Sequence, residues 1–359
     1  MMKPIRFSIL GGGWRANFYL KIAAMLPDYF QVRDVYVRDP LQRERLRTTW
    51  HVRTPDTFEQ LLQSSDSEFL VLAISKNAAA PMLLELSKLP LPLLIETPPA
   101  VSLDELDHLL ENIPAEARIQ VAEQYPLLPM MQSVTSFIQT GKLGDIQHLQ
   151  VSFGHGYHGI SLIRKWLELS DAAAGSVTGF RLHSSIMEGP YRGQLPVRER
   201  MIDTSQDLAL LQLEDGRSAL FDFTRDQYFS PIRQNRILIR GTRGEIRDDQ
   251  ATYMADYKTP INSALTRMQS GTGGSLEPLS LQGVLCEGNW LYRNPVHPAS
   301  LSDEELAIAH VLFQMRDYVR HGDQKGYSLR EACQDVYLAL KMEEAIQSGN
   351  RIDFNLNRI

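Results

Sequence analysis

Short apolar runs alternate with amphipathic segments along the first third of the chain. Residues 69–74 read FLVLAI, which is apolar on both faces of a strand, as in a buried parallel sheet. Strands that alternate with helices in this way are typical of βαβ units, so we expect a doubly wound parallel sheet of the α/β class. The predicted strands cover residues 5–10, 31–37, 69–74, 92–96 and 118–123, with a weaker strand near Val52.

Capping residues predict where the helices begin. Ser102 with Glu105 places an oxygen at a helix start and a carboxylate three residues later, where it can accept a hydrogen bond from a free amide. Similar pairs start at Asp56 and Ser328, and Ser302 begins a predicted helix that reaches about residue 320.

The pattern changes after about Tyr125, where half-exposed strands replace buried ones. Two of them are joined through Asp215 and Gly216, a favoured hairpin turn. We therefore predict two domains, residues 1–125 with the parallel sheet and residues 126–359 as an α+β domain with a mainly antiparallel sheet. The predicted elements of the second domain are a helix over 129–139 and strands over 149–153, 208–213, 218–223 and 236–240.

Residues 256–300 are rich in Gly, Ser, Pro and Asn and include the run GTGG at 271–274. Such a composition is typical of a long surface excursion, which we expect to be partly mobile.

Composition narrows the class of protein. The 359 residues are 43% hydrophobic, enough for a core in each domain, and the net charge of −6 comes from scattered side chains. This pattern argues against nucleic acid and anionic membranes as partners. Cys286 and Cys333 are the two cysteines, and no Cys/His spacing indicates a metal site. Two cysteines cannot form a disulfide framework, so a reducing cytoplasm is the expected location, and no apolar run approaches the ~18 residues of a membrane span.

A glycine-rich loop carries the first chemical signal. The run GGGWRA from Gly11 to Ala16 follows the first strand and opens the first helix. It satisfies the pattern G-x-G-x-x-A, in which Gly11 makes the turn, Gly13 lets the backbone approach a pyrophosphate, and Ala16 lets helix meet strand. The free amides of the helix N-terminus, beginning with Trp14 and Arg15, favour an anion, so a dinucleotide is predicted here.

The end of the second strand bears on which dinucleotide is bound. An acidic residue about 20 residues after the loop usually holds the ribose hydroxyls. Val37 stands at this point, followed by Arg38 and Asp39. The Arg38 guanidinium suits a 2′-phosphate, which favours NADP, while Asp39 as a ribose ligand would favour NAD. Arg15 is either a second phosphate ligand or an exposed residue of the first helical turn.

The chain at this point resembles the Gfo/Idh/MocA oxidoreductases over nearly its whole length. The resemblance implies a Rossmann domain followed by an α/β domain, NAD or NADP as cofactor, and hydride transfer to or from a sugar-like or polyol carbinol or its ketone. It also assigns Asn77 and Glu96 to the cofactor. The matching stretches are the loop at 11–16, ISKN at 74–77, IETP at 95–98, VAEQY at 121–125 and GKLGDI at 141–146.

The chain departs from the resemblance where proton chemistry is expected. The family has a lysine beside the reacting carbon, and Thr97 is its equivalent here. A hydroxyl donates a hydrogen bond but lacks the charge and the titration of lysine. The family's later signature is an acid, a histidine four residues on and often an acid three further. Here His158 matches the histidine, and Gly154 and Ser161 replace the acids.

His158 is therefore the predicted general acid/base, because a neutral imidazole can accept a hydroxyl proton near pH 7. Lys76 either replaces the missing lysine or is an exposed loop charge, Tyr157 and His155 are candidate helpers, and Glu123 either contacts substrate or caps a turn. The predicted catalytic residues are His158, Lys76, Tyr157 and Thr97; the predicted cofactor ligands are Gly11, Gly13, Trp14, Arg15, Ala16, Arg38, Asp39, Ser75, Asn77, Glu96 and Glu123.

Two other functions remain open from the sequence. The three replacements are also consistent with a nucleotide-binding sensor or scaffold that no longer turns over, or with a reductase of an imine or tetrapyrrole. The resemblance further implies a small-molecule substrate and a homo-oligomer, a dimer or tetramer, formed through the open face of the second-domain sheet.

Overall fold

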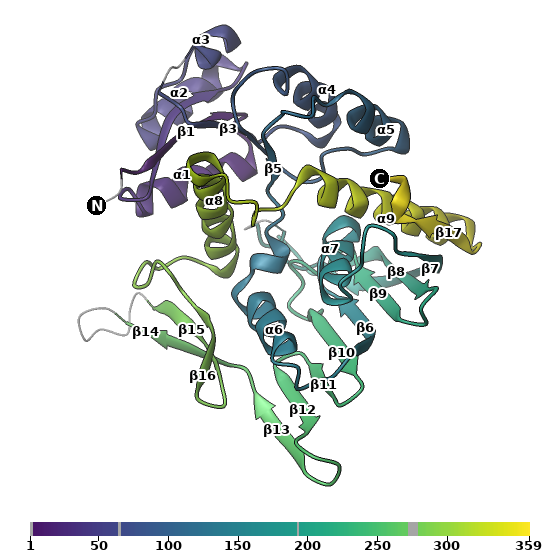
Figure 1. The fold of residues 1–359 in the computed structure, drawn as a ribbon. Helices are drawn as coiled ribbons and strands as arrows, with labels where there is room; N and C mark the ends of the chain where they lie inside the picture. The colour runs from purple at the N-terminus through teal and green to yellow at the C-terminus, as the bar shows by residue number, and fades with distance from the viewer. Residues whose placement is uncertain (1–2, 64–65, 192–193, 272–278) are drawn as a thin grey trace. The chain divides into compact units, whose positions relative to one another are not determined.

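The computed structural model describes residues 3–63, 66–191, 194–271 and 279–359, and its contacts divide the chain into two compact units. Unit 1 comprises residues 1–129, 269–282 and 294–336, and unit 2 comprises 130–268, 283–293 and 337–359. The sequence predicts a single boundary near residue 125, whereas residues 294–336 return to the first unit (Figure 1). Among the described residues, none of the helices combines the length and the hydrophobicity that a membrane span requires.

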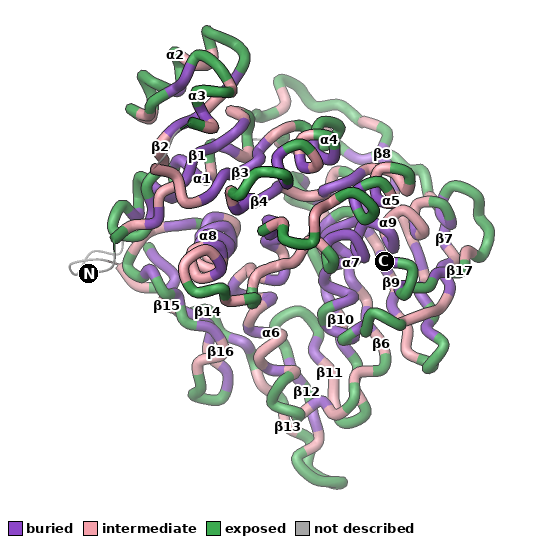
Figure 2. The backbone as a smooth tube through the Cα atoms, turned by 45° about the horizontal axis from the view of Figure 1, so that its top comes forward, coloured by how far each residue is buried: buried purple, intermediate pink, exposed green. Residues whose placement is uncertain are grey.

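Unit 1 is built on a parallel five-stranded sheet with the order β2-β1-β3-β4-β5. Its strands are β1 (Ile5–Leu10), β2 (Phe30–Tyr36), β3 (Phe69–Leu72), β4 (Leu93–Ile95) and β5 (Ile119–Val121). Figure 2 shows that β1, β3 and β4 are buried along nearly their whole length, as their apolar sequences predict. This order reverses direction beside β1, which is where ligands bind in open α/β sheets.

The first five helices of unit 1 connect its parallel strands, and two further elements come after β5. They are α1 (Trp14–Met25), α2 (Pro40–Trp50), α3 (Phe58–Leu62), α4 (Lys76–Leu86), α5 (Leu103–Asn112), the 3-10 turn η1 (Tyr125–Leu127) and α8 (Asp303–His321). The start of α5 is as predicted, since Ser102 Oγ accepts from the Glu105 amide at 3.2 Å. The start predicted at Asp56 is displaced by one residue, because Thr57 caps α3.

The weak strand predicted near Val52 is wrong. Only one parallel bridge forms there, between Asp34 and Arg53. The fully buried Asp34 carboxylate also accepts a hydrogen bond from Arg53 Nη2, at 2.7 Å. An ion pair and one bridge thus replace a sixth strand at this edge of the sheet.

Unit 2 is built on a nine-stranded sheet with the order β13-β12-β11-β10-β6-β9-β8-β7-β17. Every neighbouring pair is antiparallel except β6 and β9, which confirms the mainly antiparallel second sheet. The strands are β6 (Ile146–Ser152), β7 (Ala174–Met187), β8 (Met201–Leu213), β9 (Ser218–Thr224), β10 (Arg236–Gly241), β11 (Gly244–Arg247), β12 (Gln250–Met254), β13 (Pro260–Ala264) and β17 (Ile352–Asn355).

The helices of unit 2 cover one face of this sheet. They are α6 (Pro129–Gln139), α7 (Gly156–Trp166), the second half of α9 (Leu329–Ser348) and the 3-10 turn η2 (Leu356–Arg358). A Cβ on Gly159 of α7 would lie 2.4 Å from the Phe221 ring of β9, so glycine allows this close approach. Gly216, with φ +90°, makes the predicted turn between β8 and β9.

The surface excursion predicted over 256–300 contains regular strands. Besides β13, this segment forms β14 (Thr266–Ser270), β15 (Ser280–Cys286) and β16 (Asn289–Arg293), in a three-stranded sheet with the order β14-β15-β16. Most of the GTGG run lies outside the described residues. The apolar side chains of these strands, such as Leu281 and Val284, stand in a segment rich in Gly, Ser, Pro and Asn. Strand preference also depends on neighbouring strands that the sequence does not show.

Candidate functional site

The glycine-rich loop lies at the carboxyl end of β1, as predicted. Gly11 has φ +113°, and a Cβ there would lie 2.1 Å from the backbone oxygen of Ala73, so only glycine fits. Gly13 differs, because its φ is −78° and a Cβ there would meet no atom within 4 Å. The loop is thus tight against β3 at Gly11 and open at Gly13, which is the arrangement that lets a ligand approach the backbone.

Helix α1 begins directly after this open position. Gly13 is its N-cap and supplies no side-chain hydrogen bond, so no side chain of the cap residue covers the first amides. Ala16 is fully buried and lets α1 pack closely, as the motif predicts, while Trp14 is half-exposed and packs edge-on against Phe18.

The Arg15 side chain takes part in an ion-pair network, so its guanidinium already has partners within the chain. Its Nε is 3.2 Å from Glu96 Oε2, and its Nη1 donates to Glu304 Oε1 at 2.8 Å. In the carboxamide orientation that satisfies its neighbours, Gln124 accepts from Arg15 Nη2 at 3.0 Å. Tyr19 also donates its hydroxyl proton to Glu96. Glu304 and Tyr19 were not indicated by any motif in the sequence.

The charges of this network stabilise one another. Burial and the neighbouring Glu96 raise the pKa of Tyr19 well above its usual value, so its hydroxyl stays a donor. Burial opposes the charge of Arg15, but Glu96 and Glu304 outweigh it and raise the pKa of Arg15. The alternative that Arg15 is a simple exposed residue does not describe this geometry, since it joins the ends of β4 and α8.

The end of β2 presents Arg38 and Asp39 differently. Arg38 is exposed and makes no hydrogen bond or ion pair with any residue in the described part of the chain. The Asp39 carboxylate accepts from the Leu41 amide at 3.0 Å and so caps α2. The guanidinium is therefore available to a ligand, while the carboxylate already has a structural partner.

The loop after β3 carries Ser75, Lys76 and Asn77, and all three are exposed. Ser75 is the N-cap of α4, and its hydroxyl makes no capping hydrogen bond. These side chains lie at the carboxyl edge of the parallel sheet, where the sequence predicts them.

Glu96 and Thr97 follow β4, and Glu123 follows β5. The Glu123 carboxylate is buried and accepts from the Tyr125 amide at 3.0 Å. Of the two roles predicted for Glu123, this contact supports the turn cap.

His158 and Tyr157 lie in unit 2, in the first turn of α7, and both are buried, with His158 6% exposed. The turn before the helix passes through Gly154 at φ +78°, and Gly156, the first residue of α7, has φ +29°. A left-handed backbone at 154 favours glycine over the acid of the resembling family. Ser161, which replaces the second acid, donates to the backbone oxygen of His158 at 2.9 Å.

An aromatic cluster surrounds this histidine. The His155 and His158 rings lie edge to face with centroids 5.0 Å apart, and Tyr157 contacts His158 at 5.4 Å. The Tyr228 hydroxyl lies 2.5 Å from His155 Nδ1. Tyr228 carries no sequence signal, because it lies in a loop 73 residues further along the chain.

A hollow of about 430 Å³ lies on unit 2 beside the loop that carries Tyr228. It is lined mainly by charged and hydroxyl side chains. Across the whole described part of the chain, no cluster of three or more His, Cys, Asp or Glu is suited to a metal ion. The lining residues are Arg181, His183, Ile202, Asp203, Thr204, Ser205, Arg225 and Asp226.

Comparison with known proteins rests on solved structures. No protein-family model and no curated sequence matches the chain. An oxidoreductase from Agrobacterium radiobacter, in complex with NAD+, L-tartaric acid and magnesium, is similar with a TM-score of 0.70 and 14% identity, covering 98% of each chain. The scyllo-inositol dehydrogenase from Lactobacillus casei, with bound NAD(H) and scyllo-inositol, is similar with a TM-score of 0.65 and 15% sequence identity. The match covers 98% of this chain and 99% of the other.

A third similar structure is the WlbA dehydrogenase from Bordetella pertussis in complex with NADH and UDP-GlcNAcA. Its TM-score is 0.62 at 15% identity, and the match covers 99% of this chain and 98% of that one. At such identities the likeness establishes the fold, a Rossmann-like sheet followed by a mixed, mainly antiparallel sheet domain. The structural neighbours are oxidoreductases that bind a nicotinamide cofactor.

Proposed function

We propose that this protein is an NAD(P)-dependent oxidoreductase of a sugar-like or polyol carbinol or its ketone, and an atypical member of the Gfo/Idh/MocA family. The observation that carries the proposal is the loop from Gly11 to Ala16, which packs against the Ala73 backbone at Gly11 and has no atom within 4 Å of a Cβ at Gly13. The amides at the start of α1 follow this open backbone, and the combination fits a pyrophosphate.

The residues of unit 1 supply binding and orientation. The bound nicotinamide supplies the hydride chemistry itself. Arg38 with its unengaged guanidinium supports NADP as the cofactor, since a 2′-phosphate suits its two parallel donors. Ser75 and Asn77 border the same sheet edge, and Glu96, held by Arg15 and Tyr19, keeps the end of β4 in place.

Proton transfer is assigned to His158. An imidazole can take the proton of a hydroxyl or return it to a carbonyl oxygen at neutral pH. Burial and the surrounding rings restrict its orientation. Thr97 lacks the charge of the family's lysine, so Lys76, exposed at the carboxyl edge of the unit 1 sheet, is the candidate cation. Within unit 2, Tyr157 packs against the proposed acid/base.

A substrate screen tests the proposal. Wild-type protein is incubated with a panel of polyols and sugars, together with NADP+ or NAD+, and nicotinamide absorbance is followed. We expect turnover with at least one carbinol and a loss of roughly 100- to 10,000-fold in His158→Gln, with cofactor binding retained. His108→Gln, an exposed histidine on α5, is the control and should behave as wild type.

A second function remains a candidate because Thr97, Gly154 and Ser161 replace three residues of the resembling family. If the protein binds NADPH but oxidises or reduces none of the panel, a nucleotide-binding sensor or scaffold becomes the better account. Activity with an imine or tetrapyrrole alone would instead indicate the non-sugar reductase.

We also propose that copies of this chain associate through the open face of the unit 2 sheet, as a dimer or tetramer. Gly179 and Arg181 of β7 contact Ile346 and Glu343 of α9, so the alternate positions point away from the helices. Phe180 is 54% exposed there. The molar mass measured by light scattering should be a multiple of the 40.8 kDa chain mass, and Phe180→Arg should lower the measured mass. A monomeric mass for the wild type would refute the association.

A further inference from the structure

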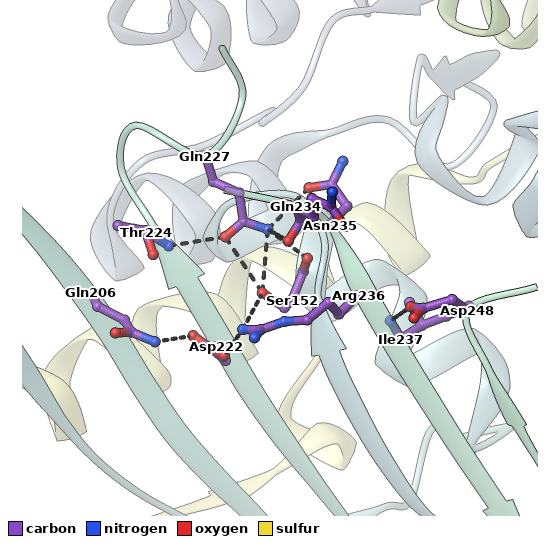
Figure 3. Close-up of polar contacts among 10 residues, drawn as sticks. All are labelled: Ser152, Gln206, Asp222, Thr224, Gln227, Gln234, Asn235, Arg236, Ile237 and Asp248. Atoms are coloured by element: carbon purple, nitrogen blue, oxygen red, sulfur yellow. Dashed lines mark hydrogen bonds and ion pairs between the residues drawn. The ribbon is translucent and has the colours of Figure 1, made fainter. Parts of the chain in front are cut away.

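The loop between β9 and β10 is anchored at its base by the buried side chain of Gln227 (Figure 3). Its Nε2 donates to Ser152 O, at the end of β6, at 2.7 Å and to Asn235 Oδ1 at 3.0 Å. Its Oε1 accepts from the Thr224 amide at 3.3 Å. Because Thr224 is the last residue of β9, this one side chain fixes the start of the loop, which is where Arg225 lies.

Arg225 continues the pairing of β9 with β8. Its amide donates to Ser205 O at 3.2 Å, directly after the last residue pair of the two strands. His183 of β7 is paired with Ser205 on the other side. Residues directly opposite one another point to the same face of a sheet, so His183, Ser205 and Arg225 form a row across three neighbouring chain segments.

The hollow of about 430 Å³ is lined by this row and lies on the face of the sheet that carries the helices. His183 stands two residues after Arg181 on β7, and Arg181 donates to Glu343 of α9 at 3.2 Å, so both point to the helix side. Asp203, two residues before Ser205 on β8, extends the lining along the same face.

Phe223 connects the hollow with the proposed acid/base. It stands two residues before Arg225 and therefore on the same face of the sheet. Its ring centroid lies 6.4 Å from that of His155, which in turn lies 5.0 Å from that of His158. The hollow and the proposed acid/base thus lie next to each other on one face of unit 2.

The hollow offers hydrogen-bond donors and acceptors that the chain itself leaves unused. In the part of the chain that the structure describes, the side chains of His183, Asp203, Ser205 and Arg225 make no hydrogen bond or ion pair. A guanidinium can only donate and a carboxylate can only accept, whereas a hydroxyl does both. Ser205 is only 7% exposed, so a ligand in the hollow is the available partner for its hydroxyl.

The charges of the lining decide which ligands fit. Two guanidinium groups, of Arg181 and Arg225, accompany two carboxylates, of Asp203 and Asp226. An anion would approach both carboxylates and a cation would approach both guanidinium groups, so like charges oppose either ligand. An apolar ligand would remove polar groups from water and form no hydrogen bonds in return. Neutral hydroxyl groups, which donate and accept, suit both kinds of side chain.

We propose that the hollow lined by His183, Ser205 and Arg225 binds the hydroxyl groups of a neutral sugar or polyol and discriminates against charged analogues. Its volume lies within the ~300–1,000 Å³ that is typical of small-molecule sites. The anchored loop holds Arg225 in place before the ligand arrives, which lowers the cost of binding. Binding stands on this geometry alone, whereas the role of the ligand as substrate rests on the proposed function.

Titrations followed by saturation-transfer NMR, without any nucleotide, test the proposal. The probes are the neutral myo-inositol and D-glucose, the anionic D-glucuronate and the cationic D-glucosamine. We expect at least one neutral probe to bind the wild type, and both charged probes to bind more weakly by roughly 10-fold or more. Absence of binding by both neutral probes, or equal or tighter binding of a charged probe, would overturn the proposal.

Two substitutions locate the binding. Arg225→Gln and Asp203→Asn change exposed side chains without partners in the described chain, so both variants should unfold at the wild-type temperature. Each should weaken the neutral probe by roughly 10-fold or more, because a hydrogen bond to a charged group is lost. Unchanged affinity in either variant would contradict the assignment of the sugar to this hollow.

Arg233→Gln is the matched control, because Arg233 lies in the same loop but not in the lining of the hollow, and it should bind the probes as wild type does. NADPH titration of the wild type separates this proposal from the proposed function. Sugar binding without NADPH binding would support the hollow and contradict the oxidoreductase. NADPH binding without sugar binding would overturn the hollow and leave the cofactor site in place.

Discussion

Two glycines of one loop should respond oppositely to the same added methyl group. Gly13→Ala places its Cβ in open space at φ −78° and ψ −167°, a conformation that alanine adopts without strain. We expect the folded protein to be unharmed, or stabilised by about 0.4–1 kcal/mol, because alanine restricts the unfolded chain. The methyl should nevertheless hold the pyrophosphate away from the backbone.

The loss in binding can be estimated from one hydrogen bond. A bond to a charged group contributes about 1.5–3 kcal/mol, so losing one weakens NADPH binding by roughly 10- to 150-fold. Gly11→Ala should instead destabilise the fold by at least ~2 kcal/mol, because φ +113° strains alanine and its Cβ would lie 2.1 Å from Ala73 O.

Thermal unfolding and NADPH fluorescence titration of the two variants read out these effects separately. The reasoning predicts that Gly13→Ala melts at or above the wild-type temperature and binds weakly, and that Gly11→Ala melts lower. Wild-type affinity in Gly13→Ala would refute the placement of the pyrophosphate at this loop.

Three further predictions concern other parts of the chain. Arg38→Ala should weaken NADPH by roughly 10- to 150-fold in fluorescence titration and leave NADH unchanged, and an equal loss for both would contradict a 2′-phosphate contact. Hydrogen bonds from Lys142, Ser263 and Tyr253 lower the pKa of Glu287 to about 2. In denaturant unfolding, wild type should therefore be more stable than Glu287→Gln by its full margin above about pH 4.5, and this margin should disappear as the pH falls toward about 2. Ser302→Ala removes the capping box of α8 and should cost about 1 kcal/mol by urea unfolding, whereas no change would mean that the helix start is not limiting.

Local patterns in the sequence were sufficient for much of the fold. The buried runs at β1 and β3, the cap at Ser102 and the Gly216 turn each depend on neighbouring residues, and all four are found in the structure. The strand near Val52 failed because its pairing depends on a single bridge and an ion pair. The strands in 256–300 were not predicted because their pairing with neighbouring strands, which composition does not show, makes them regular.

In the candidate site, too, features set by neighbouring residues were predictable and features set by distant residues were not. Gly11, Gly13 and Ala16 belong to one contiguous motif, in which Gly11 makes the predicted turn and Ala16 is buried as predicted. Arg15 could not be placed from sequence, because its partner Glu304 lies 289 residues away and belongs to the segment that returns to unit 1. Tyr228 is likewise joined to its histidine only through tertiary structure.

The most direct measurement is the fluorescence titration of wild-type protein with NADPH and with NADH. Binding of NADPH in the order of micromolar, with NADH much weaker, is the result predicted by the open glycine loop and the unengaged Arg38 guanidinium. Absence of binding for both would contradict the central claim that the loop from Gly11 to Ala16 holds a dinucleotide.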